Sequence, residues 1–318
     1  MTDATAAIGE APEQPVAIRR RHGSVVRIVR RQPQAVVGLA VLVIVVIVAV
    51  LAPYIAPYDP HTKVGPVYQP PSAKHLLGLD DGGVDMLSLL LWGARVSLLV
   101  GFAATVVAMV VGGGIGLLAG FFGNKTDVIL MRITDYFLVI PDIPLMIAAA
   151  AIWGRSLVNI ILIIGLIYWT STARLIRAQV KSVRERVYVK RARTLGASNT
   201  RLITKHVLPQ VAPLLVANTV LMMAFAIFAE TAIAFLGLGD PTAISWGRLI
   251  ENAFEGNAVI LGAWWAVVPP GVCVAVVILA CTMLGQGIED ALNPRLKVGH
   301  LSVRRFRMRP LPGRWVEE

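Results

Sequence analysis

Residues 96–122, VSLLVGFAATVVAMVVGGGIGLLAGFF, form the stretch that decides the fold, because they contain no charged side chain. A helix needs about 20 apolar residues to cross the hydrocarbon core of a bilayer, and this run meets that length. Backbone groups in lipid must be bonded within helices or closed barrels, and the run lacks the alternation with period two that a barrel strand shows. The stretch therefore predicts a membrane-spanning helix.

Five further apolar runs repeat this pattern along the chain. One of them, 133–153, carries Asp135 and Asp142 together with Pro141 and Pro144, so we expect a span whose first turn is broken. Together the runs predict six spans, over 36–55, 96–122, 133–153, 156–173, 207–235 and 265–285.

The composition agrees with a membrane protein and argues against a soluble enzyme. Of the 318 residues, 56% are hydrophobic and only 15% are charged, and the mean hydropathy is +0.69. Globular domains are about 25% charged. The two cysteines, Cys273 and Cys281, lie in an apolar run as small hydrophobic side chains and cannot build a disulfide scaffold. We predict an all-α, polytopic membrane protein with six transmembrane helices.

Basic residues gather in three segments, which predicts the orientation of the spans. Six precede the first span, ten lie between the fourth and the fifth, and seven follow the sixth. Segments rich in Lys and Arg stay on the cytoplasmic side. The pattern predicts a multi-pass cell-membrane protein with a cytoplasmic tail over 1–35, a membrane domain over 36–290, short cytoplasmic helices near 187–206 and a second cytoplasmic tail over 291–318. Because topology accounts for the charge, no nucleic-acid partner is expected.

No group of residues shows the spacing of a catalytic site. The histidines are scattered, and no pair has the spacing of metal ligands on one helix face. We therefore expect a protein that is not an enzyme, with no catalytic residue, no metal site and no cofactor of its own. One alternative stays open, an ion-coupled secondary transporter that uses Asp135, Asp142 and Glu230. The places of these acids near span ends favour a structural role.

The segment 184–209, RERVYVKRARTLGASNTRLITKHVLP, lies in the most basic loop. Tyr188, Ala192 and Leu195 recur at helical spacing and predict a narrow apolar stripe on a short, otherwise basic helix.

A turn and a second helix are predicted to follow. Gly196 can supply the left-handed residue that ends the first helix, and Ser198 or Asn199 can cap a second short helix before Pro209 opens the fifth span. The segment can lie on lipid headgroups or dock on another protein. The small residues Ala192 and Gly196 favour docking, because they allow close approach.

The same segment resembles the EAA loop of ABC importer permeases. The likeness is carried by Ala192, by Leu195-Gly196-Ala197 and by Leu208-Pro209. Lys190 and Arg191 stand where the family usually has a glutamate and an alanine. Basic residues at these places resemble the dipeptide/oligopeptide/nickel branch.

Two other stretches resemble signatures of that branch. The first comprises HLLGLD at 75–80, Gly83, Asp85 and GARVSL at 93–98, and the second comprises Glu230, FLGLG at 235–239 and SWG at 245–247. The matches extend from about Leu51 to Pro294, and the long N-terminal tail resembles the DppC/OppC type of subunit.

The resemblance implies a type I permease subunit of an ATP-driven importer for di- or oligopeptides. The implied partners are a homologous second permease, two cytoplasmic ABC ATPases that hold ATP and Mg²⁺, the lipid membrane, and an extracytoplasmic binding protein. We expect the seat of the binding protein on 58–90 and 237–264, because these are the sizeable segments predicted on the extracytoplasmic side. The residues expected to couple to the ATPases are Tyr188, Arg191, Ala192, Leu195, Gly196, Ala197, Leu208 and Pro209. Those expected at the binding-protein seat are His75, Gly78, Asp80, Asp85 and Trp246, and those expected in structural or pathway roles are Asp135, Glu230 and Gly237.

Overall fold

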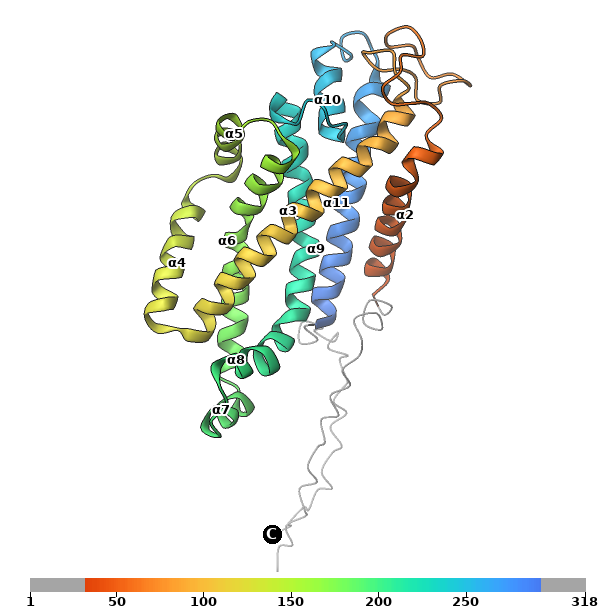
Figure 1. Ribbon diagram of the computed structural model, residues 1–318. Helices are drawn as coiled ribbons and strands as arrows, with labels where there is room; N and C mark the ends of the chain where they lie inside the picture. Colours follow the sequence, from red (N-terminus) through yellow and green to blue (C-terminus); the bar gives the residue numbers. More distant parts are fainter. Residues whose placement is uncertain (1–31, 293–318) are drawn as a thin grey trace, which may run out of the picture.

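A computed structural model describes residues 32–292, and in this range the chain forms a bundle of helices (Figure 1). The predicted tails therefore lie almost entirely outside the described residues. The helices are α2 (Pro33–Ile55), α3 (Met86–Phe122), α4 (Asn124–Val139), α5 (Asp142–Trp153), α6 (Leu157–Arg184), α7 (Val187–Thr194), α8 (Asn199–Leu202), α9 (Leu208–Ile233), α10 (Trp246–Glu255) and α11 (Trp264–Leu292).

Five helical segments are long and apolar enough to cross a membrane, and the pair α4 and α5 makes a sixth if it counts as one broken span. The axes of this pair differ by 88°. The predicted span 133–153 was therefore wrong in its bounds. The helix begins at Asn124, and the break falls at Ile140 and Pro141, which are both extended. Ile140 precedes a proline, and a residue in that place avoids the helical conformation.

The second span begins earlier than the charge-free run predicted. Asp85 caps α3, since its side chain accepts a hydrogen bond from the backbone N–H of Ser88, and the helix then runs through Arg95 without interruption. The helix therefore starts ten residues before the predicted apolar run, because a charged side chain at the edge of such a run does not end a helix.

Glycines bring α3 and α6 into close contact. A Cβ added to Gly112 would lie 2.2 Å from the carbonyl oxygen of Trp169, and one added to Gly116 would lie 2.5 Å from that of Ala173. Such distances leave no room for any side chain, so the glycine-rich end of the second span is a packing surface, as small residues are in membranes.

The fifth span continues the second short helix instead of following it. Residues Asn199–Leu238 form one long helix with π-helical turns at Ile203–Val207 and Ala234–Leu238. The first of these turns lies immediately before Pro209, where the helix lacks an N–H donor. Ser198 caps the short helix and Pro209 stands in the first turn of α9, as predicted, while the backbone between them stays helical.

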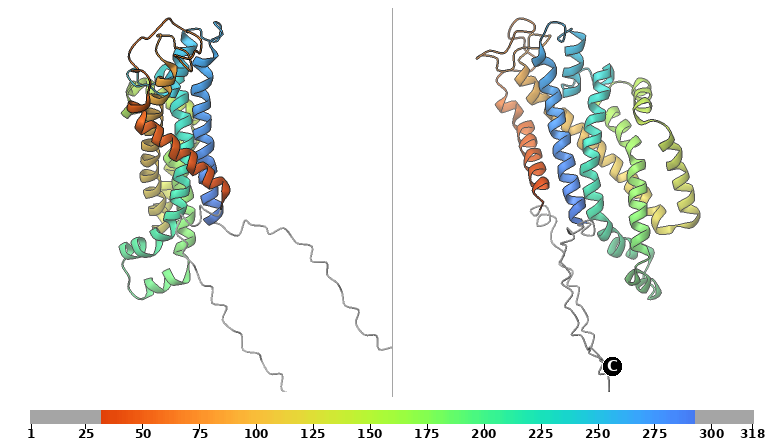
Figure 2. Two further views of the ribbon diagram at one scale, coloured as in Figure 1. Left: turned by 90° about the vertical axis from the view of Figure 1, so that its right-hand side faces the viewer. Right: turned by 180° about the vertical axis from the view of Figure 1, so that it is seen from behind.

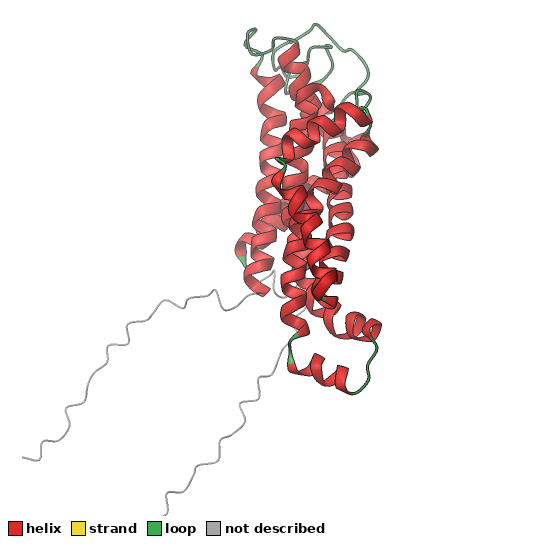
Figure 3. Cartoon of the chain, turned by 90° about the vertical axis from the view of Figure 1, so that its left-hand side faces the viewer, coloured by secondary structure: helices red, strands yellow, loops and turns green. Residues whose placement is uncertain are grey.

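The helices stand side by side in the order α2, α11, α9, α6 and α4 when the bundle is viewed from behind, with α3 crossing the other face (Figure 2). The start of α2, the end of α11 and the helices α7 and α8 lie at one end, whereas α10 and the long loop after α2 lie at the other (Figures 1 and 3).

Candidate functional sites at the two ends of the bundle

The turn after α7 has the backbone conformation that the sequence predicted. Gly196 has φ +81°, its N–H donates to the carbonyl oxygen of Arg193 at 3.0 Å, and the N–H of Ala197 donates to that of Ala192 at 3.1 Å. These two bonds satisfy carbonyls that the helix end would leave unpaired, in the pattern of a Schellman motif. Ser198 then caps α8, because its hydroxyl accepts from the N–H of Arg201.

The apolar faces of α7 differ from the predicted stripe. Val189 is fully buried and packs with Val183, Leu202 and Val207, and Ala192 lies partly buried against the same cluster. Leu195 points away, with 87% of its surface exposed. The sequence analysis missed Val189, which anchors α7 to the bundle.

Several residues expected to couple to the ATPase are exposed at this end. Besides Leu195 these are Tyr188, Arg191, Gly196, Leu208 and Pro209, while Ala197 is half-buried. Leu195 is a large apolar side chain that nothing in the described chain covers.

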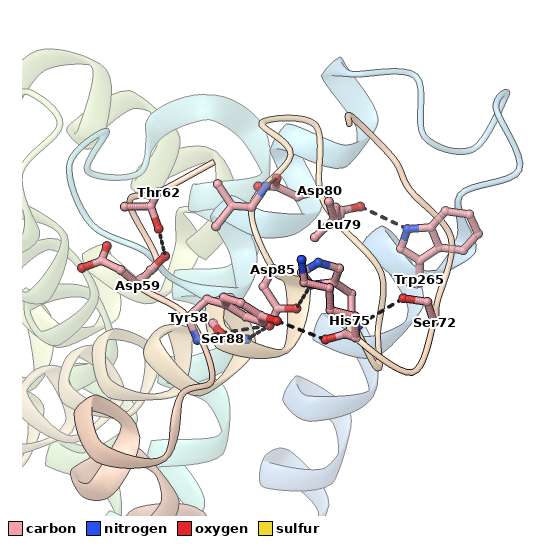
Figure 4. A network of polar contacts seen from close by, with 12 residues as sticks. Tyr58, Asp59, Thr62, Ser72, His75, Leu79, Asp80, Asp85, Ser88 and Trp265 are labelled. Carbon is pink, nitrogen blue, oxygen red and sulfur yellow. Dashed lines mark hydrogen bonds and ion pairs between the residues drawn. The ribbon is translucent and has the colours of Figure 1, made fainter. Parts of the chain in front are cut away.

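A buried network fixes the loop at the opposite end, where four of the expected seat residues lie (Figure 4). Nδ1 of His75 lies 2.9 Å from Oδ1 of Asp85, and Oδ2 of Asp85 accepts from the N–H of Ser88 at 3.0 Å. The hydroxyl oxygen of Ser88 in turn accepts from the backbone N–H of Tyr58 at 3.1 Å. His75 and Asp85 are buried, so they hold the loop in shape beneath its surface.

Gly78 lets this loop pass close to its neighbours. It has φ +68°, and an added Cβ would lie 2.6 Å from the carbonyl oxygen of Gln69 and 2.9 Å from the ring of Trp265. The indole N–H of Trp265 donates to the carbonyl oxygen of Leu79 at 3.1 Å. The loop is thereby tied to the start of α11.

A second buried network joins α10 to α3 and α9. The backbone N–H of Trp246 donates to the hydroxyl of Ser97 at 3.2 Å, and that hydroxyl donates to Oε2 of Glu230 at 3.3 Å. The indole N–H of Trp246 donates to the carbonyl oxygen of Leu90 at 3.0 Å. Glu230 is only 3% exposed and is linked through Ser97 to the first N–H of α10. Gly237 has φ +77° and interrupts the helical conformation in the π-helical turn that follows α9.

The other two acids of the ion-coupling alternative lie in different surroundings. Asp135 pairs with Arg174 at 2.5 Å on the exposed surface between α4 and α6, and Asp142 is exposed at the start of α5. The sequence analysis missed Asp127, which pairs with Arg177 and lies 2.6 Å from Nζ of Lys181. These contacts hold α4 against α6 and do not bring the three acids into one site.

Among the residues expected at the binding-protein seat, Asp80 has a strongly raised pKa. Burial, with a smaller contribution from the charge of Asp81, raises the pKa of Asp80 from 3.8 to about 6, although the N–H groups of Gly82 and Val84 bond to its carboxylate. Because the folded pKa is the higher one, protonation stabilises the folded loop. This contribution is complete below about pH 4 and is lost as the pH rises through 6.

We expect hydrogen exchange at the seat to reflect this displaced pKa. After correction for the intrinsic effect of pH, protection of the N–H groups of Leu79 and Asp80, which bond within the loop, falls between pH 5 and pH 7. Asp80→Asn keeps an acceptor and removes the titration, so its protection stays flat. Equal pH profiles for the two proteins would show that Asp80 does not control the loop.

Comparison with known proteins covers nearly all of the chain. The sequence model of the family described as "Binding-protein-dependent transport system inner membrane component" matches residues 112–298, and that of the N-terminal transmembrane domain of oligopeptide transport permease C matches 23–71. A putative peptide transport system permease protein of Brucella suis is 38% identical over 90% of this chain and 94% of its own length.

Two further relatives bear more specific names. The di/tripeptide transport system permease protein DppC of Pseudomonas aeruginosa is 38% identical, over 82% of this chain and 88% of its own length. The oligopeptide transport system permease protein OppC of Bacillus subtilis is 32% identical, over 84% and 88%. These matches and the helical bundle confirm the predicted fold class and family. The chain belongs to the inner membrane components of binding-protein-dependent transport systems, and it is a multi-pass type I ABC permease subunit and not an enzyme.

Proposed function

We propose that the chain is one of two permease subunits of an ATP-driven importer of di- or oligopeptides. Its partners in this proposal are a homologous second permease, two cytoplasmic ATPases that hold ATP and Mg²⁺, and an extracytoplasmic protein that delivers the peptide. The names of the relatives support peptides as the substrate class.

The observation that carries the proposal is the exposed α7 at the basic end of the bundle. α7 is fixed from inside by Val189 and presents Leu195 outward, as a docking helix must. It lies at the same end as the start of α2 and the end of α11, which agrees with cytoplasmic placement of both termini (Figure 1). The basic residues around α7 favour the same side.

The long helix Asn199–Leu238 supplies a mechanical link between the two ends. It begins beside α7 and carries Glu230, which is bonded through Ser97 to Trp246 of α10. Closure of an ATPase pair that holds α7 would move this helix as a rigid body and shift the seat of the binding protein. In this role Glu230 is a positioning residue that needs to accept a hydrogen bond and has no need to ionise.

Uptake by reconstituted vesicles separates this function from ion coupling. With the partner subunits, the binding protein and a labelled dipeptide, we expect uptake to require ATP and Mg²⁺ and to persist when ionophores collapse all ion gradients. Glu230→Gln keeps an acceptor for Ser97, so it should retain uptake within a few-fold of the unaltered protein. Uptake that needs a proton gradient, and that Glu230→Gln abolishes, would establish the ion-coupled alternative instead.

Cysteine labelling tests the orientation. Ser198 and Thr242 are both exposed. Ser198 caps α8 and Thr242 lies in the loop before α10, and these two helices lie at opposite ends of the bundle (Figure 1). A membrane-impermeant maleimide added to intact cells should label Thr242→Cys and spare Ser198→Cys. The reverse labelling would place the predicted coupling helix outside the cell and end the proposal.

A further inference from the structure

A largely apolar pocket opens between α2, α3 and the loop that precedes α10. Its volume is about 580 Å³, within the range of small-molecule sites. Val46 and Val50 of α2 and Leu99 of α3 line it, and between 46% and 64% of the surface of each of these side chains is exposed. An apolar pocket in the wall of a membrane domain is suited to a hydrocarbon chain.

The one charged side chain of this pocket is Arg95. It is exposed, and its guanidinium carbon lies 4.9 Å from the ring centroid of Trp92, which also lines the pocket. None of the ion pairs within residues 32–292 includes Arg95. Among the residues that the structure describes, no carboxylate pairs with this cation, and a guanidinium in such a place is complementary to a phosphate.

The length of α3 places this cation near a lipid headgroup. At 1.5 Å per residue, a helix of 37 residues is roughly 55 Å long, whereas the hydrocarbon core is about 30 Å thick. The charge-free run follows Arg95 directly, so the turns from Met86 to Arg95 lie at or beyond the boundary on the α10 side. Tryptophan and arginine are both favoured at this depth.

A smaller polar pocket of about 220 Å³ continues the apolar one toward the outside. The two pockets share His61, Thr242, Ala243 and Ile244. The smaller pocket is lined in addition by Asp80, Arg248 and Asn252. The combined cleft has a largely apolar part that includes the cation Arg95 and a more polar part that adjoins α10. This sequence of surfaces matches an acyl chain, a phosphate and a polar headgroup.

We propose that the cleft binds a glycerophospholipid of the leaflet on the α10 side. One acyl chain lies along Val46, Val50 and Leu99, the phosphate contacts Arg95, and the headgroup enters the polar pocket. The loop that precedes α10 forms part of both pockets, so a bound lipid would brace that loop. A transported peptide fits this site less well, because the apolar pocket offers few partners for peptide N–H and C=O groups.

Photo-crosslinking of the assembled importer in nanodiscs tests the site. The probe is phosphatidylglycerol with a photoreactive acyl chain, and the comparison probe is diacylglycerol with the same chains and no phosphate. We expect the phosphatidylglycerol probe to label peptides that contain 46–50 and 92–99. Arg95→Gln should lower this labelling about tenfold, the scale of one charge-assisted hydrogen bond, and Arg95→Lys should restore much of it. Diacylglycerol labelling should be weak in all three proteins.

A second pair of variants tests the apolar pocket independently of the charge. Val50→Trp fills the pocket from an exposed position, while Ile44→Trp adds the same bulk to α2 at an exposed residue that does not line it. We expect only Val50→Trp to reduce labelling. Equal labelling of Arg95→Gln and the unaltered protein, equal loss in the two tryptophan variants, or crosslinks from these positions to the second permease in place of lipid would each overturn the proposal.

Discussion

Replacing Leu195 with aspartate is expected to abolish ATP-driven uptake and to release the ATPase subunits from the membrane. The side chain is 87% exposed and lies on the outer side of the α7 turn. In the proposed complex it would be covered by the ATPase, and apolar anchors at the centre of an interface contribute most of its affinity. A carboxylate at this place would be buried without a partner, which costs several kcal/mol. We expect at least a hundredfold loss of ATPase affinity in pull-down from matched membranes.

The same substitution should leave the permease itself intact. Leu195 has no place in the buried cluster that Val189 anchors, so thermal unfolding of the purified chain should not change. Leu195→Met, which stays apolar, should keep both uptake and ATPase association, and Arg186→Ala should have a small effect. If Leu195→Asp retains the ATPases and transports, α7 is not the coupling helix, and the lipid-surface alternative for 184–209 explains the segment better.

The apolar runs predicted most of the spans because a bilayer imposes one simple requirement on length and charge. They could not predict the course of α4 and α5. That pair has a polar first turn and a break at Pro141, and its position depends on ion pairs with α6, such as Asp127 with Arg177. The beginning of α3 was missed for a related reason, since the cap at Asp85 is a local signal that precedes the apolar run.

Backbone requirements were easier to predict than side-chain surroundings. Gly196 could be assigned a left-handed conformation from its place after a short helix, and the structure confirms this. The burial of Val189 and Glu230 could not be predicted, because each depends on how separate helices pack against one another. Spacing along α7 predicted a stripe of Tyr188, Ala192 and Leu195, but the packing of α7 on the bundle decides which residues face inward, and it buries Val189.

Substitution of glycines in α3 is expected to have the second large effect, on the stability of the folded chain. Gly112 and Gly114 lie two residues apart in the same helix. A Cβ added to Gly112 would lie 2.2 Å from the carbonyl oxygen of Trp169, whereas a Cβ added to Gly114 would have no neighbour within 4 Å. Valine changes the intrinsic helix propensity equally at both positions, so the difference between the two variants isolates packing against α6.

We expect Gly112→Val to force α3 away from α6 and to prevent recovery of folded protein, while Gly114→Val behaves as the unaltered chain. A clash with backbone cannot be relieved by a rotamer change, and overpacking alone costs about 1–3 kcal/mol or more against a net stability of only about 5–15 kcal/mol. The measurement is the yield of monodisperse protein and its thermal unfolding temperature in one detergent. Equal stability of the two variants would mean that α3 and α6 can separate at little cost. The glycines would then serve movement between these helices, and the close packing at Gly112 and Gly116 would be one of two states of the transport cycle.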